Sequence, residues 1–468
     1  MWEKCIFVLW GMMVFNTKTD LLSGNIVKSL LVFAFPLFLS NIFQQLYNTA
    51  DMVIVGHFLG ETSLAAIGSC AIIFELLIGF AIGVGRGFGI VASRSYGAGN
   101  KDLLKRTVAG AIMVGCVLTL FISVVASLFM MPLLKLINIP ANIIDAAYSY
   151  ISVLIIFAIV SFTYNLCAGL LQAVGNSAMP LLFLIISSVL NILFDIFFIT
   201  SLKMGVHGAA VATVVAQGIS AMLCIIYIFK KCPMLIPGKK HFYYDSALYR
   251  DLVAQGFSMG FMLSIVSLGS VVLQRAINGL GYLVIAGHIA ARKINSFCMM
   301  PLSTIASAVT TFVSQNRGAD QPDRIRKCVR YGNLISVTWG VFISIVLVFS
   351  SGLLISAISG SKETIIMENG TRYLLINSPF YIVLGMLLNL RYALQGIGKK
   401  KTPLISSVIE FSGKIIFAFL LVPALGYFGV IICEPIIWCV MFLQLLYSFY
   451  TNPYIRGKLV TNKSARIP

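Results

Sequence analysis

Long apolar runs separated by short polar connections dominate the pattern of this chain. Twelve runs can be counted, each bounded by Gly, Pro or charged residues. None alternates apolar and polar residues as a barrel strand does, and an unclosed strand in lipid leaves backbone groups unpaired. Each run is long enough to cross a bilayer as a helix of about 20 residues. The predicted helices cover residues 30–59, 63–85, 108–131, 146–170, 180–202, 206–229, 252–277, 283–312, 333–357, 373–395, 403–423 and 427–450.

Composition excludes a set of soluble domains. Apolar residues make up 59% of the 468 residues and charged residues only 11%, whereas soluble chains carry about 25% charged residues. So few charges cannot build a water-facing surface, so we expect an all-α integral membrane protein with 12 transmembrane helices. The net charge of +18 then belongs to connections facing an anionic lipid leaflet. The lipid bilayer is the expected partner, and nucleic acid is not.

The connections between the runs differ in positive charge. The even-numbered connections and the C-terminal tail carry 22 Lys and Arg, while the odd-numbered ones carry only Lys135, Lys203, Lys362 and Arg372. The positive-inside rule therefore places both termini in the cytoplasm. Residues 5–15 form an apolar run too short to span, either a signal-like segment or a stretch preceding a true start at Met12 or Met13.

The two halves of the chain repeat. A shift of 221 places Gly60 on Gly281 and Gly205 on Gly426, and a shift of 223 places Pro180 on Pro403. Six helices per repeat is an even number, so both repeats enter the membrane in the same sense. This predicts two six-helix bundles related by a pseudo-two-fold axis along the membrane normal, with a site between them. The expected organisation is a cytoplasmic segment (1–29), an N-terminal bundle (30–229), a cytoplasmic linker (230–250), a C-terminal bundle (251–450) and a basic cytoplasmic tail (451–468).

Acidic residues inside the predicted spans require a reason, because a charge at depth costs about 2.5–3.5 kcal/mol. Counting 1.5 Å per residue, Asp51, Asp195 and Thr213 lie about 10–12 Å below the same membrane surface, and Asn191 is one turn from Asp195. Such a cluster can hold a proton or a Na⁺ ion, or it can be a structural hydrogen-bond network between helices. We favour an ion-coupling site at Asp51, Asn191, Asp195 and Thr213.

The corresponding positions of the second half lack the acid pair. They are Val272, Lys414, Ala418 and Glu434, so ion coupling is expected in the first half alone. Glu410 and Lys414 are four residues apart and should neutralise each other. The remaining charges within spans are interpreted as buried, either lining a central cavity or paired: Glu75, Arg86, Arg275 and Lys293.

Pro36 interrupts the first predicted helix, which at about 45 Å would exceed the bilayer core. A bend there can act as a gate or be a static kink. Gln44, Tyr47 and Asn48 precede Asp51 at helical spacings and form a polar stripe on its face. Separately, glycines at 79, 83 and 87 predict close contact with a neighbouring helix.

Cofactor and enzyme motifs are not convincing. The ten Cys are spaced singly, no metal-ligand or Walker motif occurs, and no cofactor is expected apart from the coupling ion. Gly256-Phe257-Ser258-Met259-Gly260 matches G-x-S-x-G, but a nucleophile elbow requires a strand before the turn.

Several motifs together resemble the multidrug and toxic compound extrusion (MATE) family of secondary transporters, in its prokaryotic branch. The similarity runs from about Pro36 to about Phe449. The residues that carry it are Pro36, Gln44-Gln45-Leu46-Tyr47-Asn48, Asp51 and Gly56, then Ser95-Tyr96-Gly97-Ala98-Gly99, Val272-Leu273-Gln274, Gly279-Leu280-Gly281, Ala290-Ala291-Arg292-Lys293-Ile294 and Gln315-Asn316-Arg317-Gly318-Ala319.

The resemblance implies a V-shaped pair of bundles that exports organic, cationic amphiphilic compounds by alternating access, in exchange for H⁺ or Na⁺. It implies a prokaryotic plasma-membrane location, a monomer, and an ion site at Asp51, Asn191, Asp195 and Thr213. Residues expected to line the substrate cavity or act in gating are Pro36, Gln44, Tyr47, Asn48, Gln274 and Lys293. Other branches of the family use acids on the seventh and tenth helices for ion binding. On those helices this chain offers only the amides Gln255, Gln274 and Asn377, which disfavours a Na⁺ site in the second bundle.

Two other function classes stay open at this point. A flippase for a lipid-linked saccharide would require a cationic central cavity, for which Arg86, Arg275 and Lys293 are candidates. An intramembrane enzyme would require a nucleophile–base pair or metal ligands at depth, and no residues are spaced for one.

Overall fold

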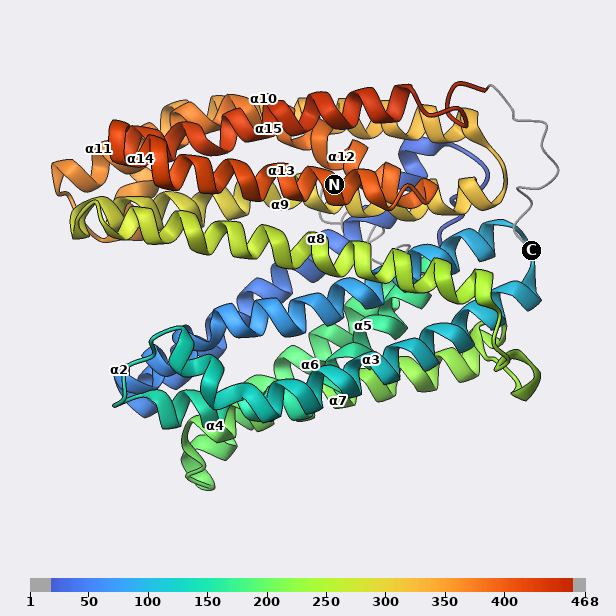
Figure 1. Ribbon diagram of the computed structural model, residues 1–468, viewed down its shortest axis with the longest axis horizontal. Coiled ribbons are helices and arrows are strands. Elements are labelled where there is room, and N and C mark those ends of the chain that lie inside the picture. The colour runs from blue at the N-terminus through green and yellow to red at the C-terminus, as the bar shows by residue number, and fades with distance from the viewer. Residues whose placement is uncertain (1–17, 458–468) are drawn as a thin grey trace, which may run out of the picture. The chain divides into compact units, whose positions relative to one another are not determined.

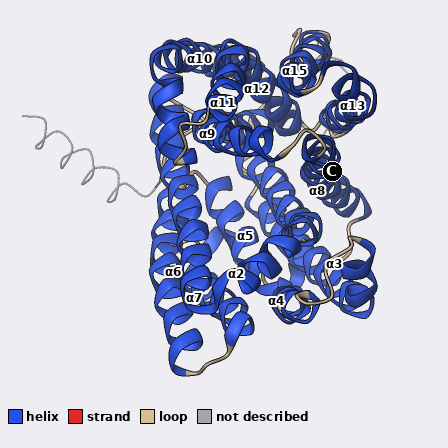
Figure 2. Ribbon diagram, turned by 90° about the vertical axis from the view of Figure 1, so that its left-hand side faces the viewer, coloured by secondary structure: helices blue, strands red, loops and turns tan. Residues whose placement is uncertain are grey.

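The computed structural model describes residues 18–457. The predicted apolar run at 5–15 and the end of the basic tail lie outside these residues. Within the described part every regular element is a helix (Figures 1 and 2). The elements are α2 (Ile26–Gly97), α3 (Lys101–Leu136), α4 (Ile144–Ile156), α5 (Ala158–Ala173), α6 (Ala178–Ile196), η1 (Phe197–Ser201), α7 (Gly205–Lys231), η2 (Pro233–Leu235), η3 (Lys239–His241), α8 (Ser246–Asn278), α9 (Tyr282–Gly318), α10 (Pro322–Ser359), α11 (Thr364–Asn377), η4 (Ser378–Phe380), α12 (Tyr381–Ile397), α13 (Lys401–Ile416), η5 (Phe417–Leu421), α14 (Val422–Leu425) and α15 (Tyr427–Tyr450).

The predicted spans are confirmed. Eleven helices of the described chain are long and apolar enough to cross a membrane, and twelve if α4 and α5, bent by 48°, form one span. α2 contains two of them, Ile26–Ala71 and Ile73–Gly97. The backbone of α2 also leaves the helical region at Gly60 (φ 81°, ψ 178°), where a positive φ is accessible to glycine without steric cost.

The internal repeat is visible in the backbone. Gly60 and Gly281 both have positive φ, as do Gly205 and Gly426, and π-helical turns η1 and η5 follow α6 and α13. The buried faces of α7 and α15 also coincide at the predicted shift of 221: Val206, Ala209, Thr213 and Cys224 correspond to Tyr427, Val430, Glu434 and Leu445. The two halves therefore fold alike, although few of their side chains are identical.

The chain divides into two compact units. The first comprises residues up to Leu21 and Phe35–Ser264, and the second comprises Leu22–Ala34 and the residues from Ile265 onward. The units thus divide within α2 and within α8, and not at the predicted linker 230–250. The connection 230–250 belongs entirely to the first unit.

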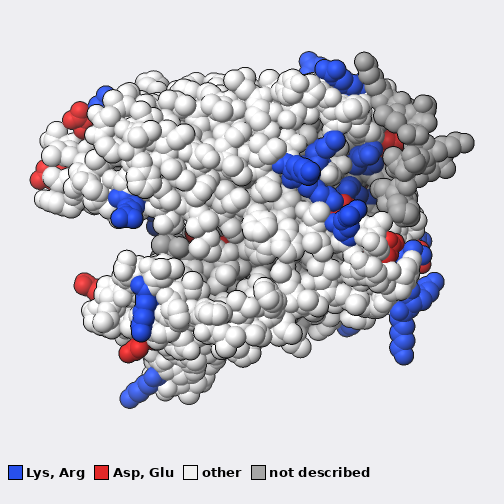
Figure 3. Space-filling view, viewed as in Figure 1, with Lys and Arg blue, Asp and Glu red and all other residues white. Residues whose placement is uncertain are grey.

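Large apolar side chains cover the outer faces of several helices. Leu128 on α3 and Phe349 on α10 are 72% and 86% exposed, and Figure 3 shows broad surfaces without charged side chains. In water such faces would promote aggregation, but in a bilayer they contact lipid tails. The protein is a multi-pass membrane protein.

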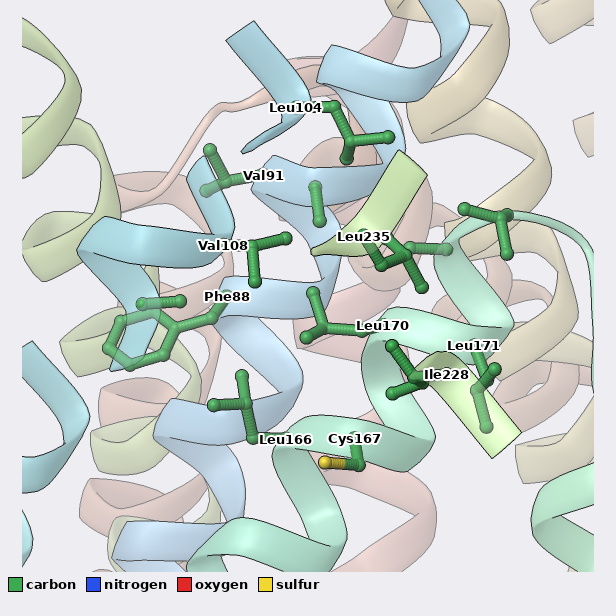
Figure 4. Packing of buried hydrophobic residues seen from close by; sticks show 14 of the residues in the cluster. Phe88, Val91, Leu104, Val108, Leu166, Cys167, Leu170, Leu171, Ile228 and Leu235 are labelled. Carbon is green, nitrogen blue, oxygen red and sulfur yellow. The ribbon is translucent and has the colours of Figure 1, made fainter. Parts of the chain in front are cut away.

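The core of the first unit joins α2, α3, α5 and α7. Phe88 and Val91 of α2 pack with Val108 of α3, Leu170 of α5 and Ile228 of α7 (Figure 4). This cluster fixes α5 and α7 against α2.

Small residues bring α2 and α8 close together inside the first unit, as the glycine spacing predicted. A Cβ atom at Gly83 would lie 2.7 Å from the Cα of Gly260, and one at Gly87 would lie 2.7 Å from the Cα of Gly256. A Cβ at Gly79 would meet nothing within 4 Å, so this third glycine does not take part.

Gly87→Ala is therefore expected to destabilise the protein by about 1–3 kcal/mol, because backbone atoms cannot move aside as a flexible side chain can. Thermal unfolding of the purified protein measures the effect. Gly68→Ala is the matched control, since its Cβ would meet no atom within 4 Å. Equal melting temperatures for both variants would contradict the close contact.

Candidate functional site

Four predicted residues come together inside the first unit. Asp51 lies on α2, Asn191 and Asp195 lie one turn apart on α6, and Thr213 lies on α7. All four side chains are buried, and that of Asp195 is fully inaccessible. These residues, which the sequence placed at one depth, thus lie together although they come from three separate helices.

The contacts within this cluster, here called the acid site (Asp51, Asn191, Asp195, Thr213), leave oxygen atoms without donors. Asn191 Nδ2 donates to Thr213 Oγ1 at 3.5 Å, and the carboxyl groups of Asp51 and Asp195 lie within hydrogen-bonding reach of each other. Among the described residues, Asp51 Oδ1, Asn191 Oδ1 and both carboxylate oxygens of Asp195 are buried with no hydrogen-bond partner.

This arrangement can bind a cation. Two ionised carboxylates cannot hydrogen-bond to each other, because neither carries a hydrogen. A shared proton would supply that hydrogen, and a Na⁺ ion would take the same oxygens as ligands, as hard cations do. The described residues contain no group of three His, Cys, Asp or Glu suited to a metal ion, so amide and hydroxyl oxygens would have to complete the coordination shell.

Two further residues border the acid site and were missed from the sequence. Tyr150 of α4 lies near both carboxyl groups, and Gln217 of α7 hydrogen-bonds with Tyr47 and accepts from the Ser161 hydroxyl. Gln217 is one helical turn after Thr213, so the helical period could have revealed it. Tyr150 had no such signal, because nothing in the sequence relates α4 to α2.

The predicted polar stripe on α2 is divided by the structure. Tyr47 lies beside both acids of the site, whereas Gln44 and Asn48 are exposed. Pro36 is buried, and the backbone stays helical through it, with the Ser40 hydroxyl donating to the Pro36 carbonyl at 2.9 Å. The passage of α2 from the second unit to the first occurs immediately before this proline.

The charges interpreted as buried are not buried. Glu75, Arg86, Arg275 and Lys293 all have exposed side chains, so the prediction of burial was wrong. That they line a central cavity stays a prediction, because a side chain facing a water-filled cavity is also accessible to solvent. Helix rotation decides exposure, and these spans are too uniformly apolar for the sequence to reveal it. Gln274 of α8, in the second unit, is half-buried and donates to Asn278 Oδ1 at 2.8 Å.

Comparison with known proteins identifies the family. A family described as MatE matches residues 36–197 and again residues 259–420, which covers more than half of the chain and repeats with a shift of 223. The chain belongs to the MATE family. It is an efflux transporter and not an enzyme, and the flippase alternative is not favoured.

Relatives of this MATE protein match most of its length. The probable multidrug resistance protein YoeA of Bacillus subtilis is 28% identical over 437 residues, covering 91% of this chain and 94% of the relative. A crystal structure of a MATE protein in the bent conformation has a TM-score of 0.87 at 22% identity, covering 94% of this chain and 98% of that chain. The outward-facing conformation of a multidrug resistance MATE family transporter of the MOP superfamily has a TM-score of 0.85 at 22% identity, with 92% and 96% covered. The fold of this chain is that of MATE transporters.

Buried acids in the second unit of this MATE protein form ion pairs with basic side chains. Lys414 Nζ donates to Glu410 at 3.0 Å, and Arg391 lies 3.6 Å from the other oxygen of Glu410. The predicted pairing of Glu410 with Lys414 is therefore confirmed. Lys414 also donates to the Ser270 hydroxyl of α8 at 3.1 Å.

Glu434 has a cation that was missed from the sequence. Arg292 Nη1 of α9 donates to Glu434 Oε1 at 2.6 Å, and the Tyr373 hydroxyl donates to Oε2 at 2.9 Å. By the repeat, Lys414 and Glu434 stand where the first unit has Asn191 and Thr213. The second unit thus has charged, ion-paired side chains at these positions, whereas the first unit has neutral ones beside oxygens that lack a hydrogen-bond donor.

Proposed function

We propose that this MATE transporter is a cation-coupled antiporter. H⁺ or Na⁺ binds at Asp51, Asn191, Asp195 and Thr213, and its transfer drives export of organic compounds by alternating access. One observation carries the proposal: Asp51 and Asp195 are buried side by side with no ion pair to a described residue, whereas the buried acids Glu410 and Glu434 each have one.

The physical argument rests on the cost of uncompensated charge. Two carboxylates removed from water are unfavourable unless a proton or cation offsets them. The acid site is therefore stable in a buried, dry environment when a proton or cation occupies it, and it favours contact with water when it is empty. A ligand shifts a conformational equilibrium only through its differential affinity for the two states, and the tight acid pair offers such a difference to a cation.

Substrate and topology belong to the same proposal. Relatives such as YoeA are named as probable multidrug resistance proteins, which supports small organic substrates, and the resemblance extends this to cationic amphiphilic ones. Residues Gln44, Tyr47, Asn48, Gln274 and Lys293 are proposed to contact the substrate, with Pro36 allowing α2 to bend. The charge of the connections supports two cytoplasmic termini, and the proposed transporting unit is the single chain in a plasma membrane.

Transport in proteoliposomes with separately imposed gradients tests the proposal. We expect a pH gradient or a Na⁺ gradient, applied alone, to accelerate uptake of a fluorescent cationic dye into liposomes that contain the protein in the inside-out orientation. An ionophore that collapses the gradient should abolish this acceleration. Protein-free liposomes are the control. Dye transport that is indifferent to both gradients would overturn ion coupling.

A further inference from the structure

The connection between α7 and α8 (residues 232–245) carries basic and aromatic side chains at its surface. Lys239 and Lys240 are exposed, and Phe242, Tyr243 and Tyr244 are 42%, 45% and 73% exposed. Aromatic rings beside lysines are typical of the membrane–water interface, where the ring lies among headgroups. This combination points to a lipid rather than to bulk water.

The connection is fixed to the start of α3, beside which it lies in Figure 1. The buried His241 ring places Nε2 3.2 Å from Asp102 Oδ1 of α3. The Arg106 guanidinium, one turn further along α3, lies 4.8 Å from the centre of the Tyr243 ring. The two lysines are therefore presented from a held position, which lowers the entropic cost of binding a ligand there.

The acids nearby are already engaged. Asp102 accepts from Arg106 at 2.7 Å as well as contacting His241, and Asp245 accepts from the backbone N–H groups at the start of α8. Lys240 lies 3.9 Å from Asp102, and its side chain is 79% exposed. Positive charge thus prevails at the surface of the connection.

An apolar track leads away from this basic surface along α3. Met113, Val117, Leu120 and Leu128 are 43%, 70%, 66% and 72% exposed, and their spacing puts them on the same helix face. The Tyr249 hydroxyl donates to the sulfur of Met113 at 3.1 Å, and the Tyr244 ring lies 5.0 Å from the Tyr249 ring. Charged, aromatic and apolar layers follow one another as headgroup, interface and acyl chain do in a phospholipid.

We propose that this surface is a binding site for one anionic phospholipid. Lys239 and Lys240 contact its phosphate, Tyr243 and Tyr244 lie at the glycerol level, and an acyl chain lies along Met113, Val117 and Leu120. A free phosphate would use the lysines alone and leave the apolar track without a role. The proposal concerns the outer face of the first unit and does not depend on ion coupling.

Native mass spectrometry of the full-length protein, titrated with phosphatidylglycerol or phosphatidylcholine, tests this site. We expect wild type to retain phosphatidylglycerol preferentially. The double variant Lys239→Gln/Lys240→Gln should bind it about 30-fold more weakly, because each lysine near an anionic headgroup contributes about a fivefold factor. The matched control is Lys399→Gln/Lys401→Gln, which removes two exposed lysines from a connection of the second unit, and it should bind like wild type.

The outcomes separate the alternatives. Equal retention of phosphatidylglycerol by wild type and the Lys239/Lys240 variant would overturn the proposal, as would an equal loss in the control variant, which would indicate general charge attraction. Displacement of the lipid by millimolar inorganic phosphate would also overturn it, since a phosphate site needs no acyl chain. Further weakening by Val117→Ser in the Lys239/Lys240 background would support the apolar track.

Discussion

Asp51→Asn is expected to reduce ion-driven export to the level of protein-free liposomes while the protein remains folded and inserted. The substitution removes one of the two carboxylates that would capture the coupling ion. An amide carries no charge at any pH and cannot release a proton, so the site stays in an occupied-like state. Dye transport under an imposed pH or Na⁺ gradient measures the loss.

The folded state should tolerate this change for a reason visible in the acid site. Asp195 has two buried oxygens without a donor, and an Asn at position 51 brings an N–H group within reach of them. The amide thus imitates a protonated carboxyl group in shape and in hydrogen bonding. We expect the melting temperature of Asp51→Asn to equal or exceed that of wild type.

Glu61→Gln is the matched control for this prediction. Glu61 is an exposed acid of the same unit, ten residues further along α2, and its replacement should leave gradient-driven export near the wild-type rate. Full ion-driven export by Asp51→Asn would refute the coupling role of the acid site. Loss of export together with loss of the folded protein would instead indicate a structural role.

Arg292→Met is expected to destabilise the protein by about 1–3 kcal/mol. This is less than the roughly 3–5 kcal/mol of a fully buried ion pair, because the Arg292 side chain is 41% exposed and water screens it. Glu434 is buried and relies on Arg292 at 2.6 Å and on the Tyr373 hydroxyl at 2.9 Å. Without the guanidinium its charge would have only a neutral donor and the more distant Lys414. Thermal unfolding in detergent, or the half-life in denaturant, measures this effect.

A second substitution distinguishes lost pairing from lost packing. In the Arg292→Met background, Glu434→Gln removes the unpaired charge and should recover most of the stability, because a neutral amide still accepts from Tyr373. Arg275→Met, which removes an exposed arginine of the same unit, should have little effect. An Arg292→Met protein as stable as wild type would show that the ion pair contributes nothing to the second unit.

The sequence predicted the spans, the repeat and the membership of the acid site. A bilayer fixes the length of each apolar run, and the helical rise converts sequence position into depth. Asp51, Asp195 and Thr213 could therefore be assigned to one layer, and Asn191 to the face of Asp195, without knowledge of packing. The glycines at 83 and 87 likewise indicated a close helix contact because only small residues permit one.

The tertiary structure alone decided which charges have partners and which faces are exposed. Arg292 and Glu434 are 142 residues apart, and no local spacing relates them. Glu75, Arg86 and Lys293 were interpreted as buried and are exposed, because a membrane helix is apolar on its lipid face and on its packed face alike, so its rotation leaves no pattern in the sequence. Tyr150 likewise borders the acid site only because α4 packs against α2.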